Sequence, residues 1–420
     1  MSESCIERPL SELATITMGQ SPESSCINTT ERGLPFLQGC AEFGERVPIA
    51  KLHCFPPLRI AKSSSVLISV RAPVGTTNFA DQDYCIGRGL GAVSAKQHMA
   101  DNIFLLHAIE RNVGFLHRRS QGSTFLAIGS KELLALPVLS LPLGTQRHIA
   151  EILSTVDEAI EQTEALIAKY QQIKAGLMHD LFTRGLTPDG HLRPTYEQAP
   201  HLYKESPLGW IPKEWEVEPL RHFVPTVVYG VSVSMSEDPA GVPVLRMNNI
   251  EQGRIDVTDL KFSQSLEVRS LLLKPGDVLF NRTNSLDHVG KTAIWRSELP
   301  VASFASYLVR LDVDRYKMRS LFLTSWLNLP STQLGIRRFA TPGVHQVNIN
   351  PTNLRRMECA APNDLAEQDL ITDRIEQLET FVSSNEQRLA KLRQQKHGLM
   401  QDLLTGRVRV KGVESQELSA

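Results

Sequence analysis

A twelve-residue repeat constrains the fold of this chain more than any other feature of its sequence. Residues 174–185 read KAGLMHDLFTRG, and residues 396–407 read KHGLMQDLLTGR. The register is constant, since Gly398 minus Gly176 is 222 and the neighbouring matches keep the same offset. Chance similarity would not hold one offset, so we interpret the two segments as copies of an internal repeat.

Each copy lies at the C-terminal end of an apolar pattern in which steps of three and four residues alternate. The first pattern runs through Ile149, Leu153, Val156, Ile160, Ile167, Tyr170, Leu177 and Leu181. The residues 222 positions later are also all apolar: Ile371, Ile375, Leu378, Val382, Leu389, Leu392, Leu399 and Leu403. This spacing is typical of a coiled-coil seam, and the position that it skips is polar in both copies, Thr163 and Asn385. The alternative is two amphipathic helices that pack on separate domain cores.

Breaker and capping residues bound both patterns, which predicts helices over 142–185 and 362–406. Pro142 and Pro362 precede the two helices, and Gly185 and Gly406 follow their last periodic residues. Each helix would run about 38 to 42 residues, or roughly 57–63 Å at 1.5 Å per residue. Helices of this length are far longer than the globular average, so we interpret them as spacers.

The repeat continues into the segments that precede the helices. GLPFL at 33–37 pairs with GVPVL at 241–245, and SSVLISVRAPVG at 64–75 pairs with GDVLFNRTNSLDHVG at 276–290. Short β-rich runs with helical patches between them predict two α+β domains. The predicted order is a first domain at 1–141, a long helix at 142–185, a linker at 186–214, a second domain at 215–361, a long helix at 362–406 and a tail at 407–420.

Composition limits the classes of function. The chain is 41% hydrophobic and 22% charged, with a formal net charge of −1. No run of 18 apolar residues and no secretory signal are apparent, so we expect a cytoplasmic protein that does not enter the membrane. The six cysteines form no C-x-x-C pair, which favours reduced thiols and no zinc. The near-neutral charge argues against strong independent DNA binding but leaves room for a local basic surface.

No catalytic motif is complete. SLDHVGKT at 285–292 lacks the first glycine of a phosphate-binding loop, and no G-x-G-x-x-G follows a predicted strand. The twelve histidines are scattered, and Asp259-Leu260-Lys261 is at most half of a nuclease motif. We therefore predict no catalytic residues, no metal and no cofactor, and a protein that binds or positions something else.

Loops that mix Arg, Asn, Gln, Thr and Gly are the candidate DNA-binding positions. Arg matches a guanine edge and Asn or Gln an adenine edge, while Arg and Lys also reach phosphates. Ordinary turn chemistry would explain the same residue types. In the first domain the candidates are Gln38, Arg71, Thr76, Thr77, Arg88, Gln121 and Ser123. In the second they are Arg246, Asn248, Asn249, Asn281, Arg282, Thr283, Asn284, Lys291, His345, Gln346 and Asn348.

The sequence resembles the specificity subunits of type I restriction–modification systems. Four features carry the resemblance: the repeated helix ends, YKESPLGWIPKEWEVEPL at 203–220, LPLGTQRHI at 141–149, and the alternation of domain and long helix. The resemblance covers nearly the whole chain. It implies two α/β target recognition domains, separated and followed by two long helices that pair as an antiparallel coiled coil, with a pseudo-twofold internal repeat.

The resemblance also implies partners and a function. Each recognition domain would read one half of a bipartite, asymmetric site in double-stranded DNA, and the helices would set the spacer between the halves. Two methyltransferase subunits would dock on the helices, and restriction subunits that translocate DNA would join that complex. The chain itself would have no catalytic activity. We assign partner contacts to Lys174, Gly176, Met178, Asp180, Thr183, Lys396, Gly398, Met400, Asp402 and Thr405.

Three alternatives remain open from the residues. The chain could be a stand-alone DNA-modifying enzyme whose site has no recognisable motif. It could be a coiled-coil scaffold whose domains bind proteins rather than DNA. At the helix ends, Gly176 and Gly398 could instead permit close approach of the two helices while the other residues cap them.

Overall fold

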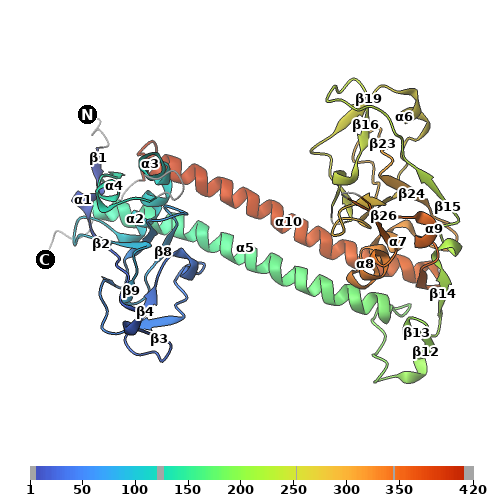
Figure 1. Cartoon of the computed structure of the whole chain (residues 1–420), viewed down its shortest axis with the longest axis horizontal. Coiled ribbons are helices and arrows are strands. Elements are labelled where there is room, and N and C mark those ends of the chain that lie inside the picture. The colour runs from blue at the N-terminus through green and yellow to red at the C-terminus, as the bar shows by residue number, and fades with distance from the viewer. Residues whose placement is uncertain (1–5, 121–126, 252, 344–345, 411–420) are drawn as a thin grey trace. The chain divides into compact units, whose positions relative to one another are not determined.

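The structure is a computed structural model, and it describes residues 6–120, 127–251, 253–343 and 346–410. The chain divides into two compact units. Unit 1 comprises residues 1–166 and 385–420, and unit 2 comprises residues 167–384. The long helices α5 (Leu143–Thr183) and α10 (Leu365–Leu403) each contribute one part to unit 1 and one part to unit 2 (Figure 1).

Unit 1 contains three sheets. An antiparallel sheet has the order β2 (Ala14–Met18), β10 (Leu90–Ala95), β7 (Val66–Ser69) and β8 (Thr77–Phe79). A second sheet has the order β3 (Ile27–Asn28), β5 (Leu52–Cys54), β4 (Leu34–Leu37), β9 (Tyr84–Ile86) and β6 (Ile60–Ala61). The third pairs β1 (Glu7–Pro9) with β11 (Pro137–Leu139). The short helices are α1 (Leu10–Leu13), α2 (Asn102–Arg111), α3 (Val113–Arg119) and α4 (Ser130–Leu134).

The main core of unit 1 lies between the first sheet and the helices. All four residues of β7 are buried, as expected for a strand inside a sheet that is covered on both faces. Asp101 caps α2 by accepting hydrogen bonds from the backbone of Ile103 and Phe104, and this fixes where the helix begins. Residues of α5 and α10 complete the core, among them Ile149, Leu153, Leu403 and Leu404.

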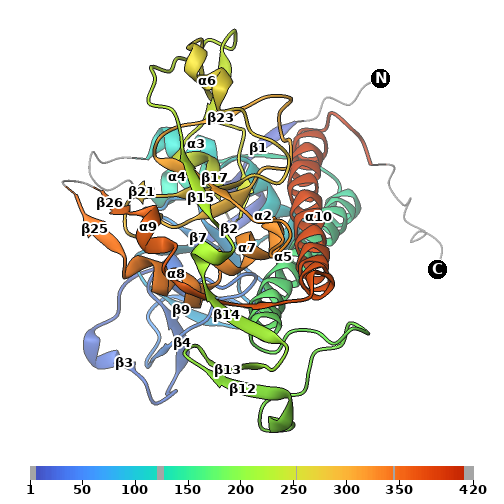
Figure 2. The same ribbon diagram turned by 90° about the vertical axis from the view of Figure 1, so that its right-hand side faces the viewer.

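Within its described residues, unit 2 contains six small sheets. Its antiparallel sheet has the order β15 (Thr226–Tyr229), β24 (Leu308–Asp312), β20 (Val278–Asn281) and β22 (Thr292–Ile294). A second sheet has the order β19 (Lys261–Ser263), β16 (Val242–Leu245) and β23 (Ser303–Phe304). A third has the order β21 (Thr283–Asn284), β26 (Val347–Ile349) and β25 (Ala340–Pro342). The pairs are β12 (Tyr203–Ser206) with β13 (Gly209–Pro212), β14 (Trp215–Pro219) with β27 (Glu358–Pro362), and β17 (Ile250–Glu251) with β18 (Arg254–Ile255). The short helices are α6 (Leu266–Ser270), α7 (Ser320–Leu327), α8 (Pro330–Arg337) and α9 (Pro351–Leu354), which are labelled in Figure 2.

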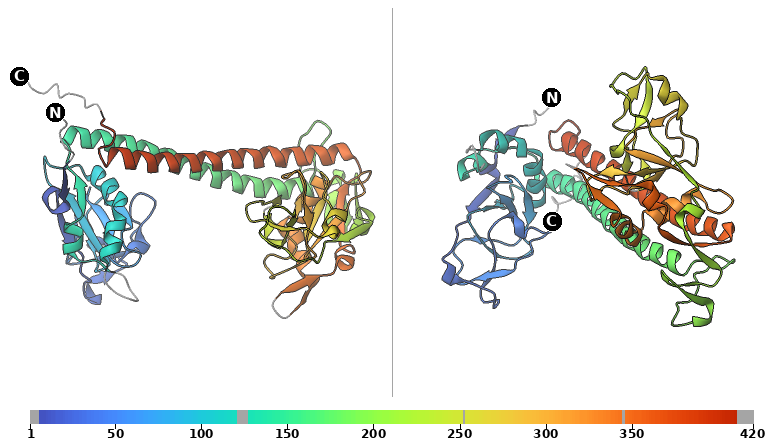
Figure 3. Two further views of the ribbon diagram at one scale, coloured as in Figure 1. Left: turned by 90° about the horizontal axis from the view of Figure 1, so that it is seen from above. Right: turned by 45° about the vertical axis from the view of Figure 1, so that its right-hand side comes forward.

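The strand order of unit 1 recurs in unit 2. The sheet β15-β24-β20-β22 repeats β2-β10-β7-β8, and the pair β14-β27 repeats β1-β11. GLPFL and GVPVL form β4 and β16, and each of these strands has one antiparallel and one parallel neighbour. Figure 3 shows both units from two further sides. The sequence repeat outside the long helices therefore corresponds to equivalent strands.

Inside each unit, a part of α5 contacts a part of α10. In unit 1, Lys396 lies 2.7 Å from Asp157 and Arg393 lies 2.6 Å from Glu164. In unit 2, Lys174 lies 2.6 Å from Glu379, and the rings of Tyr170 and Phe381 are 4.3 Å apart. In both units, residues later in α10 contact residues earlier in α5, so the contacting segments run in opposite directions. Thr163 and Asn385, the polar seam residues, are 5% and 8% exposed.

Candidate DNA-recognition edges

The loops at one end of the main sheet of unit 1 are joined to one another by their backbones. We call this set of loops the unit 1 edge; it comprises residues 18–20, 37–38, 70–71 and 87–90. Five backbone hydrogen bonds hold it together: Gly19 N to Leu90 O (2.9 Å), Gln20 N to Ile86 O (3.1 Å), Gly87 N to Leu37 O (2.7 Å), Val70 N to Gly89 O (2.9 Å) and Leu90 N to Gly87 O (3.0 Å).

Unit 2 has the same arrangement of loops, which we call the unit 2 edge; it comprises residues 229–231, 245–246, 282–283 and 305–308. Its five corresponding bonds are Gly230 N to Leu308 O (3.3 Å), Val231 N to Phe304 O (2.9 Å), Ala305 N to Leu245 O (2.8 Å), Arg282 N to Tyr307 O (3.0 Å) and Leu308 N to Ala305 O (2.8 Å). The two edges therefore share one backbone scaffold.

Both edges need a glycine at the same place. A β-carbon on Gly19 would lie 2.1 Å from the carbonyl oxygen of Gly87, and one on Gly230 would lie 2.3 Å from that of Ala305. These distances are far inside van der Waals contact, so any side chain here would push two loops of the edge apart.

Three candidate residues of unit 1 lie on its edge with their side chains exposed: Gln38, Arg71 and Arg88. Among the residues that the structure describes, none of these three side chains makes a hydrogen bond or an ion pair. Their donors and acceptors face solvent, where a ligand could reach them. Gln20, which the sequence analysis did not select, is exposed beside them.

The other candidates of unit 1 are placed differently. Thr76 is exposed in the turn between β7 and β8, where its hydroxyl donates to the carbonyl of Pro73 at 3.4 Å. Thr77 donates to Oε1 of Glu110 on α2 at 3.0 Å, so its hydroxyl is already used inside the unit. Gln121 and Ser123 lie outside the described residues.

Arg282 is the most elaborately held side chain of the unit 2 edge. Its Nη2 donates to Oδ1 of Asn348 at 3.1 Å, and its Nη1 donates to the carbonyl of Ser306 at 3.4 Å. The guanidinium carbon also lies 5.2 Å from the centre of the Tyr229 ring. Asn348 in turn donates to the hydroxyl of Thr283 at 2.8 Å, which fixes the orientation of its amide.

Two exposed tyrosines flank Arg282, and the sequence analysis did not select them. Tyr229 is 49% exposed and Tyr307 is 45% exposed. A tyrosine that is half exposed offers both an apolar face and a hydroxyl to a ligand. The position of Tyr229 in the sequence could have indicated it, because Tyr229 directly precedes Gly230, the counterpart of Gly19.

The other cations of the unit 2 edge and its surroundings have acidic partners. Arg246 donates to a carboxylate oxygen of Asp259 at 2.8 Å, and Asn248 donates to the same oxygen at 2.9 Å. The hydrogen bond from Arg246 holds the pKa of the Asp259 carboxyl below its usual range. Lys291 lies 2.7 Å from Glu251. Arg282, in contrast, has only neutral partners among the described residues, so no carboxylate there offsets its positive charge.

Two of the candidate asparagines are buried and support the loops. Asn249 is 1% exposed, accepts from the backbone of Arg246 at 2.8 Å and donates to two carbonyls of the following loop. Asn281 is fully buried, and its amide donates to the carbonyl of Met247 at 3.3 Å. Neither amide can meet a ligand without rearrangement of these loops.

The remaining candidates of unit 2 lie near the edge. The side chain of Asn284 accepts from the backbone of Ser285 at 2.8 Å. Gln346 is half-buried, and its carbonyl accepts from Gly343 at 2.7 Å. His345 lies outside the described residues.

The candidate partner contacts at the ends of the long helices fall into three groups. Lys174 and Lys396 are ion-paired inside their units. Gly176 and Gly398 are open, since a β-carbon on either would meet nothing within 4 Å, and close helix approach therefore does not explain these glycines. In the third group, Met178 and Met400 pack against the cores of their units, and Asp180 pairs with Arg184 at 3.2 Å. The hydroxyls of Thr183 and Thr405 donate to backbone carbonyls four residues earlier, those of His179 and Gln401. The backbone carbonyl of Asp402 accepts from Val408.

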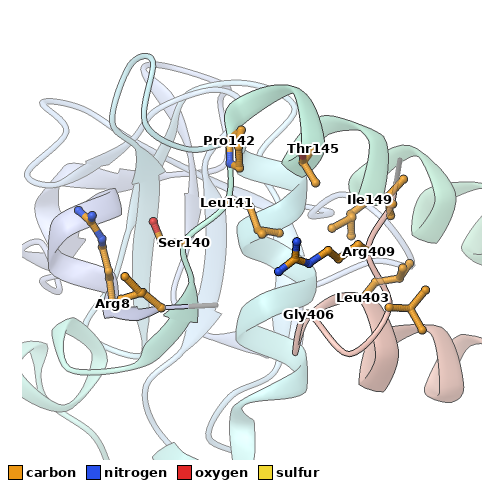
Figure 4. Close-up of a pocket in the computed structure, with 12 residues that line it drawn as sticks. Arg8, Ser140, Leu141, Pro142, Thr145, Ile149, Leu403, Gly406 and Arg409 are labelled. Carbon is orange, nitrogen blue, oxygen red and sulfur yellow. The ribbon is translucent and has the colours of Figure 1, made fainter. Parts of the chain in front are cut away.

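Unit 1 also contains a cavity of about 440 Å³, which Figure 4 shows in close-up. Arg8, Leu141, Thr145, Ile149 and Arg409 are among the residues that line it. It shares no lining residue with the unit 1 edge.

In unit 2, the corresponding end of α10 is closed. Glu367, which is 222 positions after Thr145, accepts hydrogen bonds from Arg193 at 2.5 and 3.0 Å and from the indole nitrogen of Trp215 at 3.1 Å. The three side chains are buried. A hydrogen-bonded ion pair in unit 2 thus occupies the place that corresponds to the cavity of unit 1.

Within the described residues, no three His, Cys, Asp or Glu side chains are grouped as metal ligands would be. Burial raises the pKa of the Cys54 thiol to about 12, so this thiol is not a ready nucleophile. No helix of the described chain has the length and apolar character needed to cross a bilayer.

Comparison with known proteins gives matches to one family model and to several specificity subunits. A family model for the type I restriction modification DNA specificity domain matches residues 7–172. A putative type I restriction enzyme MjaX specificity subunit from Methanocaldococcus jannaschii is 37% identical over 168 residues, which make up 40% of each chain. The type I restriction enzyme EcoBI specificity subunit from Escherichia coli is 20% identical over 412 residues, or 96% of this chain and 85% of that protein.

Two solved structures have the same fold. The S subunit of a type I restriction–modification system from M. genitalium superposes with a TM-score of 0.63 at 14% identity, covering 96% of this chain and 97% of that one. A chain from a study of the assembly and conformational transition of a type I R-M system gives a TM-score of 0.56 at 14% identity, covering 97% and 99%.

The matched domain belongs to the class of DNA specificity domains. Residues 7–172 match this family model, and over most of its length the chain is similar to specificity subunits of type I restriction–modification systems.

Proposed function

We propose that this chain is the non-catalytic DNA specificity subunit of a type I restriction–modification complex and reads a bipartite, asymmetric site. Its unit 1 edge would read one half of the site, and its unit 2 edge would read the other. The observation that carries the proposal is the shared backbone scaffold of the two edges, which present different side chains. One scaffold with two sets of side chains suits two different half-sites.

The chemistry of each edge supports a different reading. Arg282 keeps a free charge and is held in one orientation by Asn348 and Ser306, which suits bidentate recognition of guanine in the major groove. In unit 1, Gln38, Arg71 and Arg88 offer an amide and two guanidinium groups that have no partner among the described residues. Asn249 and Asn281 then serve as supports of the loops rather than as contacts.

The long helices would set the distance between the half-sites. We propose that α5 and α10 form one antiparallel coiled coil along their whole length, with the domains at 1–141 and 215–361 as recognition domains and pseudo-twofold symmetry between the halves. The reversed pairing inside each unit and the buried Thr163 and Asn385 support this proposal. Insertion of one heptad into both helices at matched positions should change the gap and leave both half-site sequences intact.

The partners would be double-stranded DNA, two methyltransferase subunits and restriction subunits. The repeat provides two equivalent surfaces for two identical methyltransferase partners, because identical subunits bind most simply at sites related by symmetry. The open positions at Gly176 and Gly398 are candidates for those contacts, together with the exposed neighbours of Met178 and Met400.

The test is a map of methylated adenines. The chain is co-expressed with the methyltransferase subunits of its own system, and the host DNA is read by single-molecule sequencing. A split, asymmetric motif with a fixed gap is the expected result, and deletion of residues 215–360 should erase one half of that motif. A continuous motif, or methylation that does not depend on this chain, would contradict the proposal.

A further inference from the structure

The recognition region of unit 2 (residues 215–361) contacts α10 in two different ways. Ile371 and Ile375 of α10 are 0% and 3% exposed in an apolar core that also includes Phe322 of α7. Beside this core Arg319 pairs with Asp369 at 2.9 Å, and further ionic contacts follow along α10. Arg296 pairs with Glu376, and Arg254 of β18 lies 3.3 Å from Glu379.

Glu379 joins three elements at one carboxylate. Its Oε1 accepts from Lys174 of α5 at 2.6 Å, and its Oε2 accepts from Arg254 of the recognition region at 3.3 Å. The Glu379 side chain is 19% exposed, and the Arg254 side chain is 49% exposed. We call Lys174, Glu379 and Arg254 the unit 2 ion-pair cluster.

Unit 1 has the equivalent cluster. Asp157 of α5 lies 222 positions before Glu379, and its Oδ1 is 2.7 Å from Lys396 of α10. Lys396 is also 3.4 Å from Glu110 on α2, and Asp157 is 3.9 Å from His107 on α2. Lys396, Asp157, Glu110 and His107 are the unit 1 ion-pair cluster.

The apolar contacts are equivalent in the two units as well. Ile149 and Leu153, the counterparts of Ile371 and Ile375, are 1% and 0% exposed in the core of unit 1. Each unit thus attaches its recognition region to the helix pair through an apolar contact and, on the next turns, through an ion-pair cluster. In unit 2 the recognition region enters this cluster through Arg254, and in unit 1 through Glu110, which pairs with Lys396.

We propose that Glu379 and Asp157 are positioning residues that fix the angle of each recognition region on its helix pair and thereby fix the gap between the half-sites. The proposal rests on the proposed DNA-reading function. Apolar burial is not directional, and the directional contacts beside it, from Arg319 to Asp369 and Gln368, act at the same end of α10 and so fix the region at one point only. Charged hydrogen bonds are directional, and this one acts eight residues from Ile371, or about 12 Å along the helix.

A small change of angle matters because DNA is read in discrete steps. Successive base pairs are about 3.4 Å apart along the duplex, so an edge that moves by this distance reads a half-site displaced by one base pair. A loose ion-pair cluster would therefore broaden the range of gaps without changing what either edge reads.

The test uses the full complex with Glu379→Gln and, separately, Asp157→Asn. These variants keep the size of the side chain and remove its charge. Methylated adenines are mapped as above, and the readout is the share of methylated sites whose gap differs by one base pair from that of the wild type. We expect this share to rise about two- to fivefold, the range for partly exposed ion pairs, with both half-site sequences unchanged.

Two matched variants separate positioning from folding. Glu379→Asp should keep the single gap, because aspartate serves at the equivalent position in unit 1. Glu164→Gln removes a carboxylate that pairs with Arg393 across the helices at 2.6 Å, and it too should keep the single gap.

Failure of this inference differs from failure of the proposed function. An unchanged gap in both Glu379→Gln and Asp157→Asn would overturn the inference while the split motif stands. An equal broadening in Glu164→Gln would overturn it too, because the effect would then come from the helix pair in general. Absence of a split motif in the wild type would refute the function itself.

Discussion

Arg282 donates a hydrogen bond to Asn348, and Asn348 donates another to Thr283. The chain of bonds leaves Asn348 only one orientation of its amide, because the oxygen must face Arg282 and the nitrogen must face Thr283. Three residues from two distant segments thereby hold one guanidinium in place, and this is the arrangement that a bidentate contact with a base requires.

Asn348→Ala should weaken discrimination in one half-site without abolishing it. The guanidinium of Arg282 would lose a partner and sample other rotamers, so we expect a loss of about 0.5–1.5 kcal/mol in the preference for the correct base. Competition binding of the complex to duplexes with single-base changes measures this. Ser270→Ala is the matched control, since its hydroxyl donates to the carbonyl of Glu267 at 2.7 Å in α6 and Ser270 is not a candidate contact. Equal losses in both variants would show that Asn348 does not act through Arg282.

Lys396→Ala should destabilise unit 1. Lys396 is 22% exposed and pairs with Asp157 and Glu110, so its removal leaves two partly buried carboxylates close together. We expect the free energy of unfolding to fall by about 1–3 kcal/mol in urea titrations. Lys169→Ala, which removes an exposed lysine of α5, should change it by less than about 0.5 kcal/mol. A similar small effect of Lys396→Ala would mean that the pair contributes little to stability.

Gly230→Ala should damage the unit 2 edge. The new β-carbon would lie 2.3 Å from the carbonyl oxygen of Ala305, so the loops that carry Tyr229 and Tyr307 must separate. We expect a loss of stability of about 1–3 kcal/mol by thermal unfolding and relaxed reading of one half-site only. Gly176→Ala is the opposite case, because nothing lies within 4 Å and a helix gains about 0.5–1 kcal/mol from the change. A neutral Gly230→Ala would refute the close-packed edge.

Stability should fall in acid partly through Glu110. Burial alone would raise the pKa of this carboxyl, but its contacts with His107, Lys396 and Thr77 outweigh that effect and lower the pKa from 4.5 to about 2. A lowered folded-state pKa means that the stabilisation is complete above about pH 4.5 and is lost as the pH falls toward 2. Glu110→Gln should therefore flatten the pH dependence of unfolding in this range by up to about 1.4 kcal/mol per pH unit. An identical slope in both proteins would exclude this role.

Sequence reasoning was most effective where a periodic pattern carries the information. The offset of 222 between Gly176 and Gly398 led to the equivalence of the long helices, and the bounds of α5 and α10 lie inside 142–185 and 362–406. Gln38 and Arg88 were selected from loop composition alone, and the structure brings them to one edge. The assignment of these residues to DNA contacts stays a prediction.

Other features depend on contacts that no local pattern encodes. Arg246 and Arg282 look alike in sequence, yet only Arg246 has a carboxylate partner, which comes from Asp259 in the next loop. Asn249 and Asn284 are both loop asparagines, and only the fold decides that Asn249 is buried. Lys174 was predicted to contact a partner because it recurs as Lys396. In the structure the two lysines instead pair with Glu379 and Asp157, two acids that are also 222 positions apart.

The measurement that tests the central claim most directly compares Arg88→Ala with Arg282→Ala in the complete complex. Methylated adenines are mapped for each variant beside the wild type. The two edges predict that Arg282→Ala relaxes discrimination at one half-site, by about 1–3 kcal/mol if its contact is bidentate, and that Arg88→Ala relaxes only the other half. If both variants alter the same half-site, or weaken methylation equally at all sequences, the two edges do not read separate halves of the DNA.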